Sequence, residues 1–158
     1  VGSEMCIRDS LNSRPLTPLS SDPNDLLALT PAHFLIGDSL TSLPEQEFLD
    51  TPSNRLSIWQ QLQKIKQDFW TRWHKEYLSE LNVRSKWFKG NHSIQEGSIV
   101  LVRDDHLPPL QWRMGRVLQT KKGPDGIVRV VTLKTANGTV DRAVKKLALL
   151  PIDPITDS

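Results

Sequence analysis

The 158-residue sequence has few of the features that carry catalysis, disulfide bonding or membrane insertion. Its single cysteine, Cys6, excludes an internal disulfide and any zinc site built on a cysteine pair. No apolar run approaches the ~20 residues of a membrane span, and no apolar core of a signal peptide is found. The glycine-rich phosphate loop and the G-x-S-x-G nucleophile elbow are also missing from it. We therefore expect a soluble, intracellular chain that does not act as an enzyme by itself.

Metal ligands are equally sparse. The histidines lie far apart, with no cysteine or second histidine at ligand spacing: His33, His74, His92 and His106. We expect surface or packing roles for them. Asp104, Asp105 and His106 form the one acidic cluster in a loop, where a solvated turn is expected and a cation site is the alternative.

The charge is small in sum but uneven along the chain. The net charge is only +2, which by itself predicts no nucleic-acid partner. Residues 1–50 hold 2 basic and 8 acidic residues, a net −6, whereas residues 51–95 carry +5 and residues 96–158 carry +3. The basic excess thus lies after residue 51, as expected for a polyanion-facing region joined to an acidic spacer.

The first 53 residues predict no domain of their own. Residues 1–10, VGSEMCIRDS, begin without methionine, show no periodicity and resemble translated sequencing-adapter read-through, so we expect a non-native segment and missing upstream protein. Residues 11–53 contain six prolines and predict an extended linker with at most one short turn. Phe34, Leu35 and Ile36 form an apolar plug in it, which we expect to pack on another surface. Residues 152–158 are expected to be a flexible tail.

Residues 54–82 predict one long amphipathic helix that Ser53 or Asn54 caps. Its apolar residues recur every three or four positions: Ile58, Leu62, Ile65, Phe69, Trp73, Tyr77 and Leu81. A helix of ~40 Å is too long for one small barrel to bury, so part of this stripe is expected to serve a partner. The spacing averages above 3.6, which argues against a left-handed heptad coiled coil. We expect packing roles for Phe69, Trp70, Trp73 and Tyr77.

Residues 94–151 predict five short strands, at 97–104, 112–119, 127–135 and 139–144 and in a last strand ending at Pro151. Asn137 and Gly138 are the strongest hairpin signal. The predicted fold is α+β: a Pro-rich linker, the long helix, and a five-stranded antiparallel SH3-like β-barrel. Structural roles are expected at six positions: Trp112, Gly115, Val117, Asn137, Gly138 and Leu147.

Basic residues of this barrel are the candidate nucleic-acid contacts: Arg113, Arg116, Lys121, Lys122, Arg129, Arg142, Lys145 and Lys146. Arg113 and Arg116 have opposite parity, so they share a face only if the strand bulges between them, at Gly115. A merely solvated face explains the same pattern, and the sequence leaves the two interpretations open. Lys64, Lys66, Arg72 and Lys75 of the helix either extend the basic surface or form the wet side of the helix.

Several motifs in the same order resemble the C-terminal region of Bel/Pao (Pao-type) long-terminal-repeat retrotransposon polyproteins. These are LNSRPLTPLSSDPNDLLALTPAHFLIG, FWTRWHKEYLSEL, W-x-x-G-x-V from Trp112 to Val117, GPDGIVRVVTLKT, and R-x-V-x-K-L from Arg142 to Leu147. The resemblance runs from Leu11 to Pro151 and implies the end of an integrase core, a linker helix and the integrase C-terminal domain, a domain of unknown function.

The resemblance implies a non-catalytic integrase module that holds double-stranded DNA through its phosphates and aids integrase assembly. The partners would be element or target DNA, the integrase core and other integrase subunits, in the nucleus or a virus-like particle. The carboxylates that bind Mg²⁺ or Mn²⁺ in the parent integrase would lie upstream, with no cofactor held here. Two alternatives remain: a reader that tethers chromatin or host proteins, and a purely structural scaffold.

Overall fold

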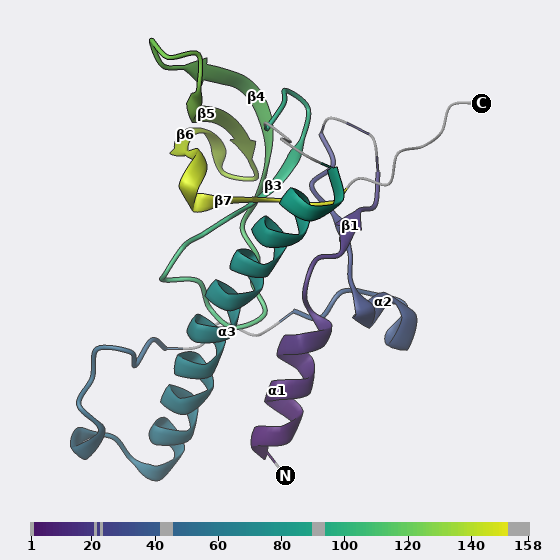
Figure 1. The fold of residues 1–158 in the computed structure, drawn as a ribbon. Coiled ribbons are helices and arrows are strands. Elements are labelled where there is room, and N and C mark those ends of the chain that lie inside the picture. The colour runs from purple at the N-terminus through teal and green to yellow at the C-terminus, as the bar shows by residue number, and fades with distance from the viewer. Residues whose placement is uncertain (1, 21, 23, 42–45, 90–93, 152–158) are drawn as a thin grey trace.

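The computed structural model describes residues 2–20, 22, 24–41, 46–89 and 94–151; the expected tail at 152–158 lies outside them. A long helix, α3, runs diagonally, with a five-stranded sheet at one end and a short helix, α1, beside its middle (Figure 1). The elements are α1 (Gly2–Asn12), β1 (Thr17–Pro18), β2 (Ala28–Leu29), α2 (Pro31–Ile36), η1 (Ser53–Arg55), α3 (Ile58–Lys89), β3 (Ile99–Val102), β4 (Met114–Lys122), β5 (Val128–Thr135), β6 (Gly138–Ala143), η2 (Val144–Lys146) and β7 (Leu147–Leu149).

The sheet confirms the α+β prediction of a long helix followed by five antiparallel strands. The strand order is β6-β5-β4-β3-β7, so β3 pairs with both β4 and β7. In the described part of the chain β6 and β7 do not pair, and the sheet is therefore open rather than a closed barrel.

Strand β3 is the centre of the core because both of its faces are buried. Val100 and Val102 face the sheet's inner side, with Val117, Val131, Leu133 and Leu147. Ile99 and Leu101 face the other way and pack against Leu78 and Leu81 of α3. This arrangement explains why the strand is apolar throughout rather than alternating, and it fixes the C-terminal half of α3 on the sheet.

Helix α3 begins later and ends later than predicted. Its cap is Ser57, since the Ser57 hydroxyl accepts from the Gln60 amide at 3.3 Å and the Gln60 side chain accepts from the Ser57 amide at 2.9 Å. This is a reciprocal capping box. The predicted caps, Ser53 and Asn54, belong instead to the short 3-10 turn that follows Pro52. Without Gly or Pro before Gly90, α3 continues through Lys89.

The buried face of α3 differs from the predicted apolar stripe. It is formed by Gln67, Trp70, His74, Leu78 and Leu81, whereas Ile58, Leu62 and Ile65 are 81%, 52% and 60% exposed. The prediction that part of the stripe lies outside the core is thus confirmed. Among the described residues, no helix has the length and apolar character required to traverse a lipid bilayer.

Residues 11–53 are more structured than an extended linker. They contain the end of α1, the β1–β2 hairpin and the short helix α2, which α1 contacts. Residues 1–10, for which no periodicity was found, lie mostly in α1, which packs beside α3. Phe34, Leu35 and Ile36 of α2 remain exposed, so no described surface buries the predicted plug.

Three long-range hydrogen bonds tie the segment after α1 to the rest of the fold. Tyr77 donates its hydroxyl to the Pro15 carbonyl at 2.5 Å, and Trp112 donates its indole N–H to the Ser13 hydroxyl at 3.1 Å. Thr17 donates to the carbonyl of Pro151, the last described residue, at 3.0 Å. We call residues 13–17 the clasp, because they join α3 to the segment before β4 and to the residue that follows β7.

Two turns differ in register from the prediction. Strand β4 extends to Lys122, so Lys121 and Lys122 lie in the strand and the turn begins at Gly123. In the second hairpin Thr135 pairs with Gly138, which makes Ala136 and Asn137 the central turn residues. Gly138 instead opens β6 with a φ of 117°, a conformation that favours glycine.

Candidate nucleic-acid interface

The outer face of β4, β5 and β6 brings some of the predicted basic residues together. Opposed residues in antiparallel strands share a face, and Arg116 is opposite Lys134 while Lys121 is opposite Val130. In a regular strand, residues 116 and 121 would lie on opposite faces because they are an odd number of positions apart. Residue 118 has no partner on β5, and this bulge shifts the alternation so that Arg116 and Lys121 lie on the same face. The condition under which Arg113 and Arg116 would share a face, a bulge at Gly115, is not met, because Gly115 pairs regularly with Thr135.

Arg116 is engaged by the N-terminal segment. Its guanidinium donates to the carbonyls of Gly97 and Asp22, both at 2.9 Å, and more weakly to that of Asp25. The neighbouring Lys134 donates to the Asn24 side chain at 2.5 Å. Asp22, Asn24 and Asp25 therefore cover this end of the outer face, and Arg116 acts there as a structural clamp.

Lys121 is neutralised by an acid on β6, which lies beyond β5 in the strand order. Its ammonium lies 2.5 Å from a carboxylate oxygen of Asp141, whose other oxygen accepts from the Thr132 hydroxyl at 2.6 Å. The hydrogen bond from Lys121, followed by that from Thr132, lowers the pKa of Asp141. A phosphate approaching Lys121 would meet this ionised carboxylate, so the centre of the outer face is a poor anion site.

Two other predicted contacts lie away from this face and are also paired. Arg113 precedes β4 and forms an ion pair with Asp104 in the loop after β3. Arg129 pairs with Asp125 of the β4–β5 turn at 2.5 Å. Arg113 and Arg116 therefore do not converge.

Four predicted basic residues remain without an ion pair to any acidic group among the described residues: Lys122, Arg142, Lys145 and Lys146. Arg142 is half-buried and donates to the Asp141 carbonyl at 3.0 Å. The three lysines are exposed. Lys122 ends β4, and η2, which carries the other two, contacts the adjoining β5.

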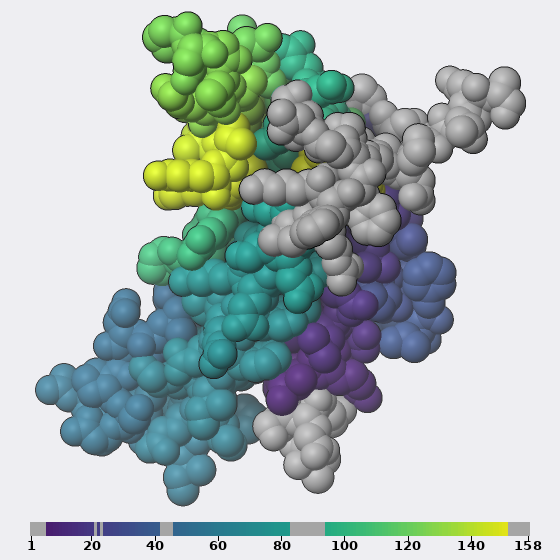
Figure 2. All heavy atoms as spheres, viewed as in Figure 1, coloured from purple at the N-terminus to yellow at the C-terminus, as the bar shows by residue number. Residues whose placement is uncertain are grey.

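The η2 region and the β4–β5 hairpin form adjacent parts of one surface (Figure 2, yellow and green). We call Lys122, Lys145 and Lys146 the lysine cluster. Among the described residues these are the exposed members of the predicted site without an ion pair to an acidic side chain.

Residues 57–150, which include α3 and all five strands of the large sheet, match the Family of unknown function (DUF5641). The chain belongs to the DUF5641 family. No curated protein and no solved structure matches it.

The DUF5641 chain also has an aromatic cluster that the sequence did not predict as a unit. Trp112 packs edge-on against Trp70, Trp73 and Tyr77, with ring centroids 5.1 to 5.6 Å apart, and lies 4.9 Å from the His74 ring. Trp70 and His74 are 1% and 2% exposed. Burial lowers the pKa of His74 from 6.5 to about 4. The packing roles predicted for these aromatics are thus observed, and Trp112 joins α3 to the sheet.

The other predicted structural residues lie in the sheet. Val117 and Leu147 are buried in its inner core. A Cβ on Gly115 would lie 3.2 Å from the Leu133 Cβ and 3.3 Å from the Lys134 carbonyl oxygen. Gly115 therefore allows a close backbone approach rather than a bend.

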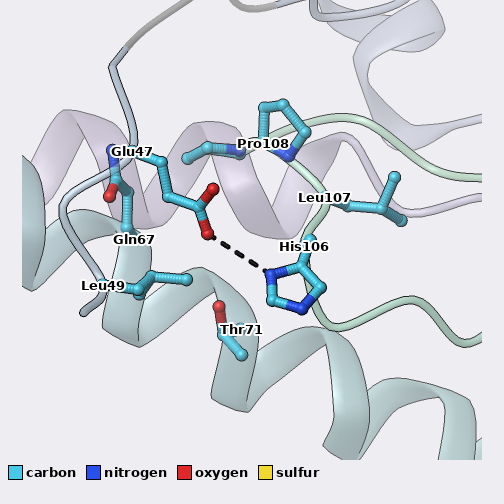
Figure 3. A pocket seen from close by; sticks show the side chains of 8 residues that line it. Glu47, Leu49, Gln67, Thr71, His106, Leu107 and Pro108 are labelled. Atoms are coloured by element: carbon cyan, nitrogen blue, oxygen red, sulfur yellow. Dashed lines mark hydrogen bonds and ion pairs between the residues drawn. The ribbon is translucent and has the colours of Figure 1, made fainter.

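The loop after β3 contributes to a small pocket of about 130 Å³ in the DUF5641 chain. The Glu47 carboxylate lies 3.4 Å from the His106 ring. Figure 3 shows the two facing each other, with Thr71 of α3 below the ring and Gln67 of α3 on the other side of Glu47. The nearby Asp104 pairs with Arg113, and Asp105 with Lys75 at 3.1 Å. The described residues contain no group of three acidic, histidine or cysteine side chains that could hold a metal ion.

Proposed function

We propose that this DUF5641 chain is a non-catalytic module of a retrotransposon integrase that binds double-stranded DNA through phosphates and aids integrase assembly. The observation that carries the proposal is the lysine cluster, in which three exposed ammonium groups have no acidic partner among the described residues. Such groups bind phosphates without base preference, because backbone contacts carry no sequence information. The resemblance to Bel/Pao polyproteins supports DNA as the polyanion and an integrase as the parent protein.

The proposed fold of the sheet is an SH3-like barrel. Its support is the pairing of β3 with both β4 and β7, and the 3-10 turn η2 that leads from β6 into β7. These connections bring the last strand back beside the first, as in small five-stranded barrels. In this arrangement η2 sits at the rim, where its lysines can reach a duplex lying across the end of the sheet.

The lysine cluster predicts weak, salt-sensitive binding. Each phosphate contact contributes about 0.9 to the slope of log affinity against log salt for duplex DNA. Three contacts therefore predict a slope of about −2.7 from this cluster. Dissociation constants in the micromolar range or weaker are expected, as for other non-specific DNA binding.

Fluorescence anisotropy with a labelled duplex of random sequence, at several salt concentrations, tests the proposal. Replacing Lys122, Lys145 and Lys146 together by alanine should lower the affinity and flatten the salt slope by about 2 to 3. Lys145→Ala should weaken binding more than Arg55→Ala, which removes an equally charged, exposed side chain at η1, the opposite end of the molecule (Figure 1). Binding that is absent at low salt, or equal in these variants, would contradict the proposal.

A chromatin reader has less support. Recognition of methyl-lysine requires an open cage of aromatic rings, but the rings around Trp112 pack on one another and Trp70 is buried. A histone-peptide pull-down without DNA separates this function from DNA binding. A chain that binds neither DNA nor peptide would fit the scaffold alternative. A location in the nucleus or a virus-like particle follows only from the integrase proposal.

A further inference from the structure

The N-terminal half of α3 presents an apolar stripe to solvent. Ile58, Leu62 and Ile65 are more than half exposed, and the half-buried Phe69 continues the line. Their spacing of four, three and four residues equals eleven residues in three turns, close to the natural period of the helix. The stripe therefore runs nearly straight along one side of α3.

The opposite side of this half-helix is already covered. The Lys64 ammonium donates to the carbonyls of Phe48, Leu49 and Thr51, at 3.2, 2.6 and 2.9 Å. Gln67 accepts from the Phe48 amide at 2.9 Å. The loop before η1 is thus fixed on one face of the helix, and at 100° per residue the stripe faces away from that loop.

We propose that the occupant of this stripe is α3 of a second copy of the chain, packed antiparallel about a two-fold axis that passes between Leu62 and Ile65. In that register Leu62 of one copy lies against Ile65 of the other, and Ile58 lies against Phe69. A two-fold interface is self-complementary, so each contact occurs twice. Because the two helices are antiparallel, the two sheets lie at opposite ends of the helix pair.

The residues beside the stripe suit this pairing. The exposed Trp59 lies on one edge of the stripe and widens the apolar surface that a second copy can cover. An antiparallel two-fold arrangement places each edge of the stripe beside the same edge of the partner, so both copies contribute Trp59 on the same side of the interface.

The size of the stripe sets the strength of the dimer. The exposed parts of Ile58, Trp59, Leu62 and Ile65 would bury on the order of 500 Å² per copy, or about 1,000 Å² in total. This lies at the lower limit of specific interfaces. The dimer should therefore be concentration-dependent, with monomers dominant at low micromolar concentration.

The inference names the assembly contact of the proposed function, but it uses no residue of the lysine cluster. Sedimentation velocity of the full chain without DNA, from about 1 to 200 µM, should show an increase from monomer to dimer mass. Leu62→Glu should abolish the increase. The matched control replaces Phe34, Leu35 and Ile36 of α2 by serine: these side chains are at least as exposed as Leu62 but lie on a helix of six residues, and dimerisation should persist.

A mixing experiment tests the antiparallel register. Leu62→Lys and Ile65→Glu chains should each be monomeric, whereas an equimolar mixture should reach the dimer mass, because the introduced lysine of one chain then faces the introduced glutamate of the other. A wild-type chain that stays monomeric at 200 µM overturns the inference. Three other results would also overturn it. They are a dimer that persists in Leu62→Glu, loss of the dimer in the α2 control, and no association in the mixture of Leu62→Lys and Ile65→Glu chains. The Leu62→Glu monomer should still bind DNA with the salt dependence expected of the lysine cluster, as measured by fluorescence anisotropy. A failure of DNA binding can therefore be distinguished from a failure of dimerisation.

Discussion

Lowering the pH from 7 to 5 should destabilise the fold through His74. The imidazole is 2% exposed and lies between Trp70 and Trp112. Desolvation lowers its pKa to about 4; the carboxylates of Asp104 and Asp105 oppose this shift, and Arg103 and Lys75 add to it. In the unfolded chain the pKa returns to about 6.5. Between these values the unfolded state binds more protons than the folded state.

The sign and size of the effect follow from this difference. The stability that the fold keeps while His74 is neutral is fully present above pH 6.5 and is lost as the pH falls toward 4. Linkage with these two pKa values gives a loss of about 2 kcal/mol between pH 7 and 5. Below pH 4 the total loss in the free energy of unfolding levels off at about 3 kcal/mol. Asp105 also has a lowered pKa, mainly because Lys75 donates to it. Its contribution is lost only below about pH 4, outside this window.

Urea unfolding followed by tryptophan fluorescence at pH 7, 6 and 5 measures the loss. His74→Phe keeps an aromatic ring in the cluster but removes the titrating group, so the free energy of unfolding should become nearly independent of pH in this range. His106→Gln, which removes an exposed histidine, should retain the wild-type dependence. An unchanged pH dependence in His74→Phe would refute the assignment, whatever that variant's stability at pH 7.

Three further substitutions test how the fold uses its polar and glycine residues. Lys64→Met removes the donor to the carbonyls of Phe48, Leu49 and Thr51 and should cost about 1 to 3 kcal/mol, with faster proteolysis in residues 46–52. Gly115→Ala should lower the free energy of unfolding by about 1 to 3 kcal/mol, because the new methyl group meets the β5 backbone. An unchanged free energy of unfolding would show that β5 moves to make room for it. Arg116→Ala should speed cleavage near residues 22–25 but reduce DNA affinity less than Lys145→Ala does. The reverse order of affinities would return Arg116 to the DNA interface.

Periodicity predicted the main elements because α3 and the strands bury regular apolar faces. It failed in detail where polar residues are buried. Gln67 and His74 lie on the buried face of α3, since one binds the loop at residues 46–48 and the other packs in the aromatic cluster. The true start of α3 was present in the sequence as the Ser57 and Gln60 capping box, but Ser53 and Asn54 are equally good caps in isolation.

The candidate site was harder to predict because its chemistry depends on pairing between distant residues. Arg116 meets the carbonyl of Asp22, and Lys121 meets Asp141 across two strands. Neither contact has a local signal, and the bulge at Leu118 has none either. Only the pair formed by Asp125 and Arg129, four residues apart, could be read from local spacing. Sequence thus identifies the basic residues, while tertiary contacts decide which of them can meet an external anion.

The clasp sets a boundary for any shortened version of this protein. The family match begins at residue 57, yet Tyr77 and Trp112 take their hydrogen-bond acceptors from Pro15 and Ser13. A chain cut at residue 57 would leave both polar groups without those acceptors at the junction of helix and sheet, and would uncover the aromatic rings beside them. We therefore expect a shortened chain to stay folded only if it begins before Ser13, and we expect truncations that start at the family match to aggregate.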